Sequence, residues 1–187
     1  MSLIKSSGKL GIQFLERRIK NMSKTIRVSV SGVDAKATTD QATRTKEPTG
    51  PVPFSYPCKI VRVIDGDSIV VDIDLGFSHW IHGESIRLYG VDCPECRSRN
   101  KEEKAAGFLA KEFVEEVLHV GGTYMLQTKE KGKFGRFLGV IFIQGSASIN
   151  AALISENLAV PYTGQSKKEV QAEHEANYKI LKGKGLI

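Results

Sequence analysis

The 187-residue chain has no long apolar segment. A membrane-spanning helix needs about 20 consecutive apolar residues, and a secretory signal needs a compact apolar run near its start. The sequence has no apolar run of membrane-spanning length, and its first thirty residues lack the compact apolar run of a secretory signal. We therefore expect no membrane span and an intracellular, cytoplasmic protein. The basic segment Lys9–Lys24 has Leu10, Phe14, Leu15 and Ile19 near helical spacing, so an organelle transit peptide stays open as an alternative.

Cysteine is scarce, because the chain has three, an odd number. Without a secretory signal, this argues for reduced thiols rather than for a disulfide framework. The composition, with 41% apolar and 26% charged residues, is that of a folded globular protein. A chain of this length is long enough for one ordinary domain and short for two. We therefore look for one domain with an accessory segment.

Charge is distributed unevenly along the chain. The formal net charge is +6, and residues 1–57 contain ten of the 27 basic residues but four of the 21 acidic ones. Residues 58–187 are balanced, so the excess lies in the first segment. Its part 34–50 has no aromatic and almost no large aliphatic residue, which predicts a flexible linker.

We predict two parts: a basic, largely disordered arm over residues 1–57, with a short amphipathic helix near Gly11–Asn21, and a domain over residues 58–187. Such an arm suits attraction to nucleic acid, or contact with a protein partner. A solvated tail without a partner is an equal alternative.

Segments rich in β-branched residues follow the arm. They predict strands over Lys59–Ile64 and Ser68–Ile73, joined by a turn, and a third strand over Ser85–Val91 after an extended hairpin tip, Asp74–Glu84. Five strands, with a helix after the third and further helices at the end, predict an α+β, mainly β fold: a five-stranded OB-type barrel with three packed helices. The later elements are a helix over Lys101–His119, strands over Thr123–Thr128 and Phe137–Ile143, and helices over Ser148–Ser155 and Lys168–Leu181.

Acidic and basic side chains stand at the ends of the predicted strands, where a barrel can bring them to one rim. Carboxylate oxygens bind hard divalent cations, and a cation together with arginines stabilises the charge that develops as a phosphodiester is hydrolysed. The planar guanidinium of Arg grips two phosphate oxygens at once. This combination predicts phosphodiester hydrolysis. The residues are Asp65, Asp67, Arg87, Asp92, Glu95 and Arg136.

Three motifs occur in order along the chain: Val63–Ser68, Ile86–Glu95 and Lys133–Arg136. Together they resemble the first metal-binding turn, the central catalytic segment and the second arginine loop of the staphylococcal nuclease family, also called thermonuclease-like domains. The resemblance covers roughly residues 58–181. It implies a nuclease that hydrolyses DNA, and RNA as a second substrate, leaving 3′-phosphate ends. It also implies a calcium ion, with magnesium or manganese as alternatives.

The resemblance further assigns roles to single residues. It implies that Asp67, Asp92 and the backbone carbonyl of Cys93 bind the ion, with Asp65 as a further candidate. Glu95 is then expected to orient or deprotonate the attacking water. The remaining residues face the substrate: Arg87 and Arg136 are expected to hold the scissile phosphate, and Lys133 and Tyr162 to contact a terminal phosphate or a flanking nucleotide.

Two positions depart from the family pattern. Cys93 stands where Thr or Ala is usual, which is tolerable if its carbonyl alone contacts the metal. Phe134 stands where the best-known members have Tyr, so a hydroxyl to the ligand is missing. The extended hairpin tip and the arm also lie outside the minimal family plan.

Several other interpretations compete with the nuclease. Asp65-Gly66-Asp67 alone is explained by a plain hairpin turn. Cys93 and Cys96, with His79 and His82, have the two-residue gaps of a Cys2His2 zinc site. His119 and His174 are expected to cap helices or to lie on their surfaces. Finally, related domains that have lost active-site residues bind nucleic acid or protein without cutting, so a non-catalytic binding module is the alternative function.

Overall fold

The computed structural model describes residues 54–132, 135–144 and 147–187, all of which lie in the unit Val52–Ile187. Residues 1–53 of the predicted basic arm, with its amphipathic helix, lie outside the described residues, as do Lys133 and Phe134. Residues 54–57, which the sequence assigned to the arm, are described and belong to the same unit as the domain. In the part of the chain that is described, no helix is both long enough and apolar enough to cross a bilayer.

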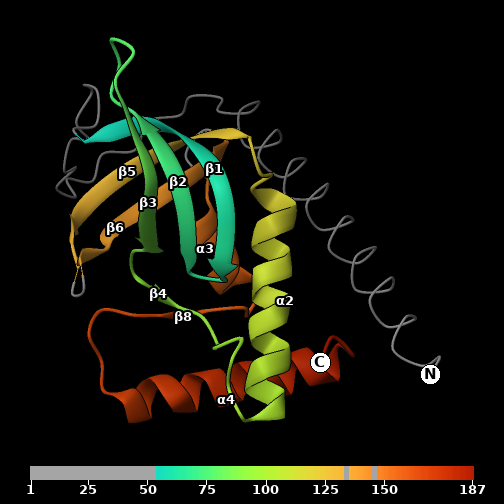
Figure 1. The fold of residues 1–187 in the computed structure, drawn as a ribbon. Coiled ribbons are helices and arrows are strands. Elements are labelled where there is room, and N and C mark those ends of the chain that lie inside the picture. Colours follow the sequence, from blue (N-terminus) through green and yellow to red (C-terminus); the bar gives the residue numbers. More distant parts are fainter. Residues whose placement is uncertain (1–53, 133–134, 145–146) are drawn as a thin grey trace, which may run out of the picture. The chain divides into compact units, whose positions relative to one another are not determined.

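Five long strands form a closed barrel (Figure 1). Neighbouring strands pair antiparallel in the order β3-β2-β1-β5-β6, and a parallel pairing of β3 with β6 closes the barrel, with Ile86 opposite Phe137. The predicted α+β fold, an OB-type barrel with three helices, is confirmed. The long strands are β1 (Ser55–Asp65), β2 (Ser68–Asp74), β3 (Trp80–Leu88), β5 (Thr123–Lys131) and β6 (Phe137–Gln144).

Three short strands complete the sheets. β4 (Val91–Asp92) pairs antiparallel with β8 (Val160–Pro161), and β7 (Ala147–Ser148) pairs with the end of β6. In Figure 1 the β4–β8 pair lies between the lower end of the barrel and the last helix. Gly90, whose φ of 75° suits glycine, separates β3 from β4.

The barrel is filled with apolar side chains from every long strand. Burying them supplies the main driving force for folding, because apolar surface is removed from water. Helices contribute further buried side chains to the same core. The largest fully buried side chains include Ile60, Ile69, Ile86, Leu88, Leu126 and Ile141 from the strands, and Phe113, Ile149, Leu153 and Leu181 from the helices.

Three helices pack around the barrel and each begins at a capping side chain. Asn100 caps α2 (Lys101–Val117) by accepting a hydrogen bond from the amide of Glu102. Ser148 caps α3 (Ile149–Ser155) in the same way. The last helix, α4 (Lys167–Gly183), begins with a capping box in which the side chains of Ser166 and Glu169 each bond to the other's backbone amide.

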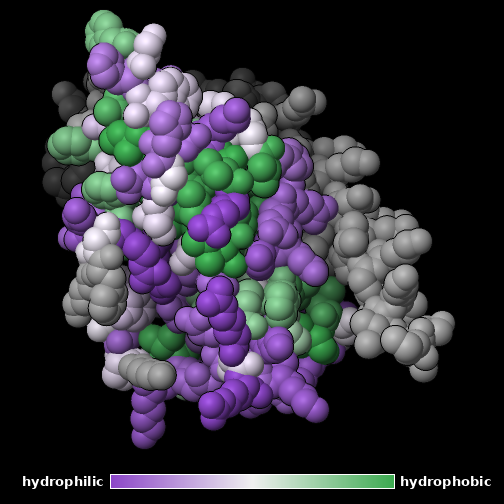
Figure 2. All heavy atoms as spheres, in the orientation of Figure 1, coloured by the Kyte–Doolittle hydropathy of each residue, from purple (hydrophilic) through white to green (hydrophobic). Residues whose placement is uncertain are grey.

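The hairpin of β2 and β3 is longer than the sequence predicted. Trp80 and Ile81 pair with Asp74 and Ile73, so the hairpin tip, predicted over Asp74–Glu84, shortens to residues 75–79. β-branched and aromatic side chains fit a sheet, which explains why pairing continues. The hairpin tip carries apolar side chains that are visible at the top of Figure 2. Phe77, at the turn, is 97% exposed.

Candidate active site

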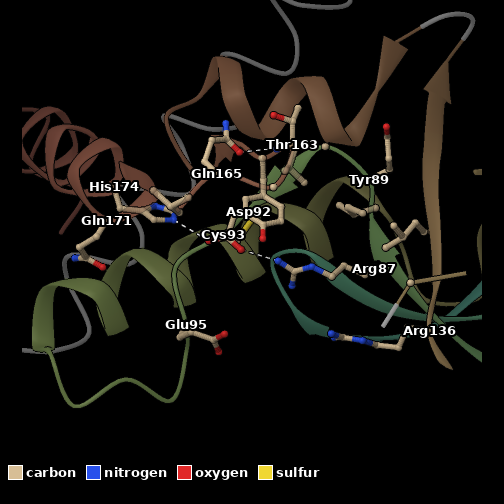
Figure 3. A pocket seen from close by; sticks show the side chains of 18 of the residues that line it. Arg87, Tyr89, Asp92, Cys93, Glu95, Arg136, Thr163, Gln165, Gln171 and His174 are labelled. Atoms are coloured by element: carbon tan, nitrogen blue, oxygen red, sulfur yellow. Dashed lines mark hydrogen bonds and ion pairs between the residues drawn. The ribbon is translucent and has the colours of Figure 1, made fainter. Parts of the chain in front are cut away.

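A cavity of about 750 Å³ lies where the end of the barrel faces β4, β8 and α4. Side chains from distant parts of the chain extend into it, as Figure 3 shows. Six residues that line it were predicted as site residues: Arg87, Asp92, Cys93, Glu95, Arg136 and Tyr162. His174, which was expected to cap a helix or lie on its surface, lines it too.

Arg87 bridges two carboxylates at the inner edge of this cavity. Its Nη1 atom lies 2.9 Å from Oδ1 of Asp67, and its Nη2 atom lies 2.6 Å from Oδ1 of Asp92. The Asp67 side chain is only 6% exposed, whereas that of Asp92 is 27% exposed. Asp67 therefore lies behind Arg87, and Asp92 faces the cavity.

The turn between β1 and β2 places Asp67. Asp65 pairs with Ser68 across this turn, as the hairpin signal predicted. The Ser68 hydroxyl donates to Oδ1 of Asp67 at 3.0 Å, and the Cys93 amide donates to Oδ2 at 3.1 Å. The second bond ties the turn to the segment that follows β4.

The two carboxylates have opposite electrostatic environments. Burial raises the pKa of Asp67, and the nearby charge of Arg87 and the bonds from Cys93 and Ser68 do not offset it. Burial also acts on Asp92, but the hydrogen bond from His174 and the charge of Arg87 outweigh it and lower its pKa. The charge of Arg87 thus does not outweigh the deeper burial of Asp67, whereas Arg87 and His174 together outweigh the burial of Asp92.

Glu95 lies on a segment that is packed tightly against α2. An added Cβ atom at Gly107 of α2 would lie 2.8 Å from the Cys96 amide nitrogen and 2.9 Å from the Glu95 carbonyl carbon. A glycine is therefore needed for the helix to approach this backbone. The Glu95 side chain is exposed, and Figure 3 shows it extending toward the side of the cavity where Arg87 and Arg136 lie.

The environment of Glu95 disfavours its charge. Although the side chain is exposed, nearby protein atoms partly desolvate it and raise its pKa, and the carboxylates of Asp67, Asp65 and Asp92 add to the effect. Asp65 itself accepts a hydrogen bond from Cys96, whose thiol pKa is raised to about 11 by burial first and then by this bond. Asp65 therefore points toward the Cys96 side of the turn.

Arg136 and Tyr162 line the outer part of the cavity. Arg136 precedes β6, is half-buried, and makes no ion pair among the residues that the structure describes. Tyr162 follows β8, is 39% exposed, and donates its backbone amide to the carbonyl of Gly90 at 2.9 Å. The structure does not place Lys133.

The alternative zinc site is not formed. The Cys93 and Cys96 side chains are buried beside the first turn and α2, whereas His79 and His82 lie near the hairpin tip. His82 instead contacts Asp72, with Nδ1 3.2 Å from Oδ2. Within the described ranges, no three His, Cys, Asp or Glu side chains are grouped as an all-protein metal cage. The Cys2His2 interpretation is wrong.

Two buried residues that hold the site were missed. Asn150 of α3 donates to the carbonyls of Tyr89 and Gly139, which fixes the turn before β4 against β6. His174 of α4 lies 3.1 Å from Asp92, so the expectation that it caps or decorates a helix is wrong. Val170, His174 and Tyr178 follow one another at helical spacing, and all three are buried on one face of α4. This spacing is the sequence signal that could have identified His174 as a buried residue.

The donor set at the inner edge of the cavity fits a hard divalent cation. Asp67 and Asp92 already direct oxygen atoms at one shared cationic group, Arg87. Two carboxylates with water and substrate oxygens suffice for such an ion, so an all-protein cage is not required. The raised pKa of Asp67 also marks a carboxylate that a further positive charge would stabilise.

Comparisons with known proteins agree with this geometry. The family model described as "Staphylococcal nuclease homologue" matches residues 85–184. The chain is 33% identical to a thermonuclease of Staphylococcus intermedius over 65% of this chain and 72% of the relative, and 33% identical to that of Staphylococcus hyicus over 54% and 56%. An uncharacterized protein of Methanocaldococcus jannaschii is 32% identical over 50% and 52%. The chain thus spans about half the length of two of these three relatives.

Proposed function

The chain belongs to the staphylococcal nuclease homologue family, and we propose that it is a metal-dependent endonuclease that hydrolyses phosphodiester bonds of DNA and RNA. One observation carries the proposal. Arg87 is held between two carboxylates at the edge of a cavity into which Glu95 and Arg136 also extend. The site thus combines three kinds of group: cationic side chains that can bind a phosphate, a carboxylate that can deprotonate water, and oxygen atoms that can bind an ion.

The residues that would hold the ion are Asp67, Asp92 and the carbonyl of Cys93, with Asp65 as a further candidate. Calcium is the first expectation, and magnesium and manganese are the alternatives. When bound, such an ion neutralises phosphate oxygens and makes a coordinated water more acidic. The Cys93 side chain is buried toward Gly66, so its thiol is directed elsewhere and its backbone remains the relevant ligand.

The two arginines hold the scissile phosphate. The guanidinium of Arg87 has five N–H donors, and its bonds to Asp67 and Asp92 leave others for phosphate oxygens. Because those carboxylates fix its orientation, little side-chain entropy is lost when substrate binds. Arg136 directly precedes β6. It stabilises the charge that develops on the phosphate in the transition state.

Glu95 activates the attacking water. A general base works best when its pKa lies near the working pH, and the environment of Glu95 shifts its pKa in that direction. Its exposure leaves the carboxylate accessible to water in the cavity. The water oxygen bonds to phosphorus as the P–O5′ bond breaks, which leaves a 3′-phosphate end and a 5′-hydroxyl end. Tyr162 and Lys133 contact the terminal phosphate or a flanking nucleotide.

The basic arm adds non-specific affinity for the polyanion. Its excess charge is opposite in sign to the substrate, and the counterions that it displaces favour binding at low salt. A protein partner for the arm is the alternative proposal. We place the enzyme in the cytoplasm, where targeting by the arm restricts its action on host nucleic acid.

Cleavage of supercoiled plasmid and of single-stranded RNA tests the proposal. The purified chain is incubated with calcium, magnesium, manganese or EDTA, and Glu95→Gln is compared with Glu112→Gln, a matched change at an exposed position of α2 outside the cavity. We expect metal-dependent cutting that the first substitution abolishes and the second preserves. Well-folded protein that binds nucleic acid but cuts in no metal would instead identify a non-catalytic binding module.

A further inference from the structure

His174 connects the last helix to the cavity. It lies on α4, is 5% exposed, and its Nε2 atom is 3.1 Å from Oδ2 of Asp92. The other carboxylate oxygen of Asp92 is bound by Arg87. Asp92 is therefore held from two sides, by a strand of the barrel and by a helix that follows it much later in the chain (Figure 3).

The imidazole of His174 is itself held firmly. Its ring stacks on Tyr178, one helical turn later, with ring centroids 6.1 Å apart and planes inclined by 16°. Because an ionised carboxylate only accepts hydrogen bonds, Nε2 is the donor to Asp92. The Nδ1 atom is buried and has no partner among the described residues. Within the described ranges, the bond to Asp92 is thus the one polar contact of this ring.

We propose that His174 is a positioning residue for Asp92, and that it sets the affinity of the site for its divalent cation. The inference rests on the proposed function, in which Asp92 is a ligand of that ion. In this inference His174 acts on the ion through Asp92, to which its Nε2 atom is bonded.

The physical reason is the orientation of the carboxylate. A ligand oxygen binds an ion well only if its carboxylate plane is fixed beforehand, because ordering it on binding costs entropy. With a donor on each oxygen, rotation of the Asp92 carboxylate about its side-chain bonds is restricted. Loss of such an outer partner typically lowers metal affinity by about 10- to 100-fold.

The geometry also explains why α4 belongs to the functional unit. Its buried face, with Val170, Tyr178 and Leu181 on either side of His174, anchors the helix beside β8 and α2. Asp92 lies on β4, which pairs with β8, so the helix and its carboxylate partner are fixed to the same short sheet. The position of Nε2 follows from this packing.

The test compares His174→Leu with His174→Gln in the full chain. Leucine fills the space without a donor, whereas the side-chain nitrogen of glutamine reaches the place of Nε2. His119→Leu is the matched control, because it makes the same chemical change at an exposed histidine outside the cavity. Binding of calcium and of manganese is measured by calorimetry, cutting is measured against metal concentration, and melting temperature is recorded in EDTA.

We expect His174→Leu to weaken metal binding, and to raise the metal concentration for half-maximal cutting, by about 10- to 100-fold. Cutting should recover at saturating metal, His174→Gln should restore most of the affinity, and the control should match the wild type. A leucine variant that melts earlier but keeps the wild-type metal affinity would reduce His174 to a packing residue and overturn the inference.

The inference and the proposed function fail in different ways. A wild-type chain that binds metal but cuts nothing overturns the proposed function, while the calorimetric comparison still decides the role of His174. A wild-type chain that binds neither calcium nor manganese overturns both. If the wild-type chain cuts nucleic acid and both His174 variants keep its metal affinity, the inference alone is overturned.

Discussion

An added Cβ atom at Gly107 would lie 2.7 Å from the carbonyl oxygen of Pro94, closer than real Cβ contacts come. A glycine inside a helix costs about 1 kcal/mol relative to alanine. Gly107 nevertheless lies within α2, where the helix contacts the segment that carries Glu95. The close approach therefore sets the position of that carboxylate.

Replacing Gly107 by alanine should displace the 94–96 segment. We expect cutting to fall on the order of 100-fold, because a misplacement of about 1 Å has that effect on a catalytic group. Overpacking costs about 1–3 kcal/mol, partly offset by the better helix propensity of alanine. Gly183→Ala, in α4 with open space around its Cβ position, is the control and should leave cutting unchanged. Equal activity of the two variants would contradict the role assigned to Gly107.

Asp67→Asn should stabilise the metal-free protein while it removes metal binding. The pKa of Asp67 is raised in the folded state, so the ionised form is disfavoured by folding at neutral pH. The increase in stability from the asparagine substitution should therefore be largest near pH 7. It should shrink as the pH falls, because the wild-type carboxylate then takes up a proton. Thermal unfolding in EDTA at several pH values measures this. A variant that melts below the wild type at pH 7 would show that the pair with Arg87 outweighs burial.

Asp92→Asn should have the opposite effect on stability. The pKa of Asp92 is lowered in the folded state, so its ionised form contributes stability above its ordinary pKa, and this contribution is lost as the pH falls through the folded value. The variant should melt earlier than the wild type at neutral pH, and the difference should vanish in acid. Removing one partner of a buried charge network costs about 3–5 kcal/mol, which is an upper limit for this partly exposed group. A constant difference at all pH values would indicate lost packing instead.

The pH dependence of cutting should report Glu95. As the base, it must be deprotonated, so kcat/KM should rise with pH through a pKa above the ordinary value of 4.5. Assays at saturating metal separate this step from metal binding. Glu95→Gln should lose about 100- to 10,000-fold in rate and should also lose this rise. The assignment of the base is wrong if the rise persists in the variant.

Removal of the basic arm should flatten the salt dependence of nucleic-acid binding. Each phosphate neutralised by Lys or Arg contributes about 0.9 to the slope of log affinity against log salt on duplex DNA. The structure indicates how much of the chain to delete. β1 begins at Ser55, and the carbonyl of Phe54 accepts a hydrogen bond from the Thr128 amide. The deletion should therefore end at Pro51 and not at Pro57. Binding titrations over a range of salt concentrations provide the slope. An identical slope for both chains would remove the arm from substrate binding.

The strand plan was predictable because it depends on local pattern. β-branched residues around Asp65-Gly66-Asp67 indicate a hairpin whatever the rest of the chain does, and Asn100 and Ser148 are local helix starts. The start of β3 at Trp80 was not predictable in the same way. Pairing of Trp80 with Asp74 depends on the partner strand, and the sequence assigned Trp80 to the extended hairpin tip.

The residue types of the candidate site were also available from the sequence, since carboxylates and arginines at strand ends are the groups that phosphodiester hydrolysis needs. The sequence by itself thus determined the family, the barrel and the chemical groups. The tertiary structure alone decided that Arg87 bridges Asp67 and Asp92, that Gly107 admits the Glu95 segment, and that His174 reaches Asp92. These contacts join residues far apart in the chain, and their distances are set by packing between elements, which no local pattern encodes.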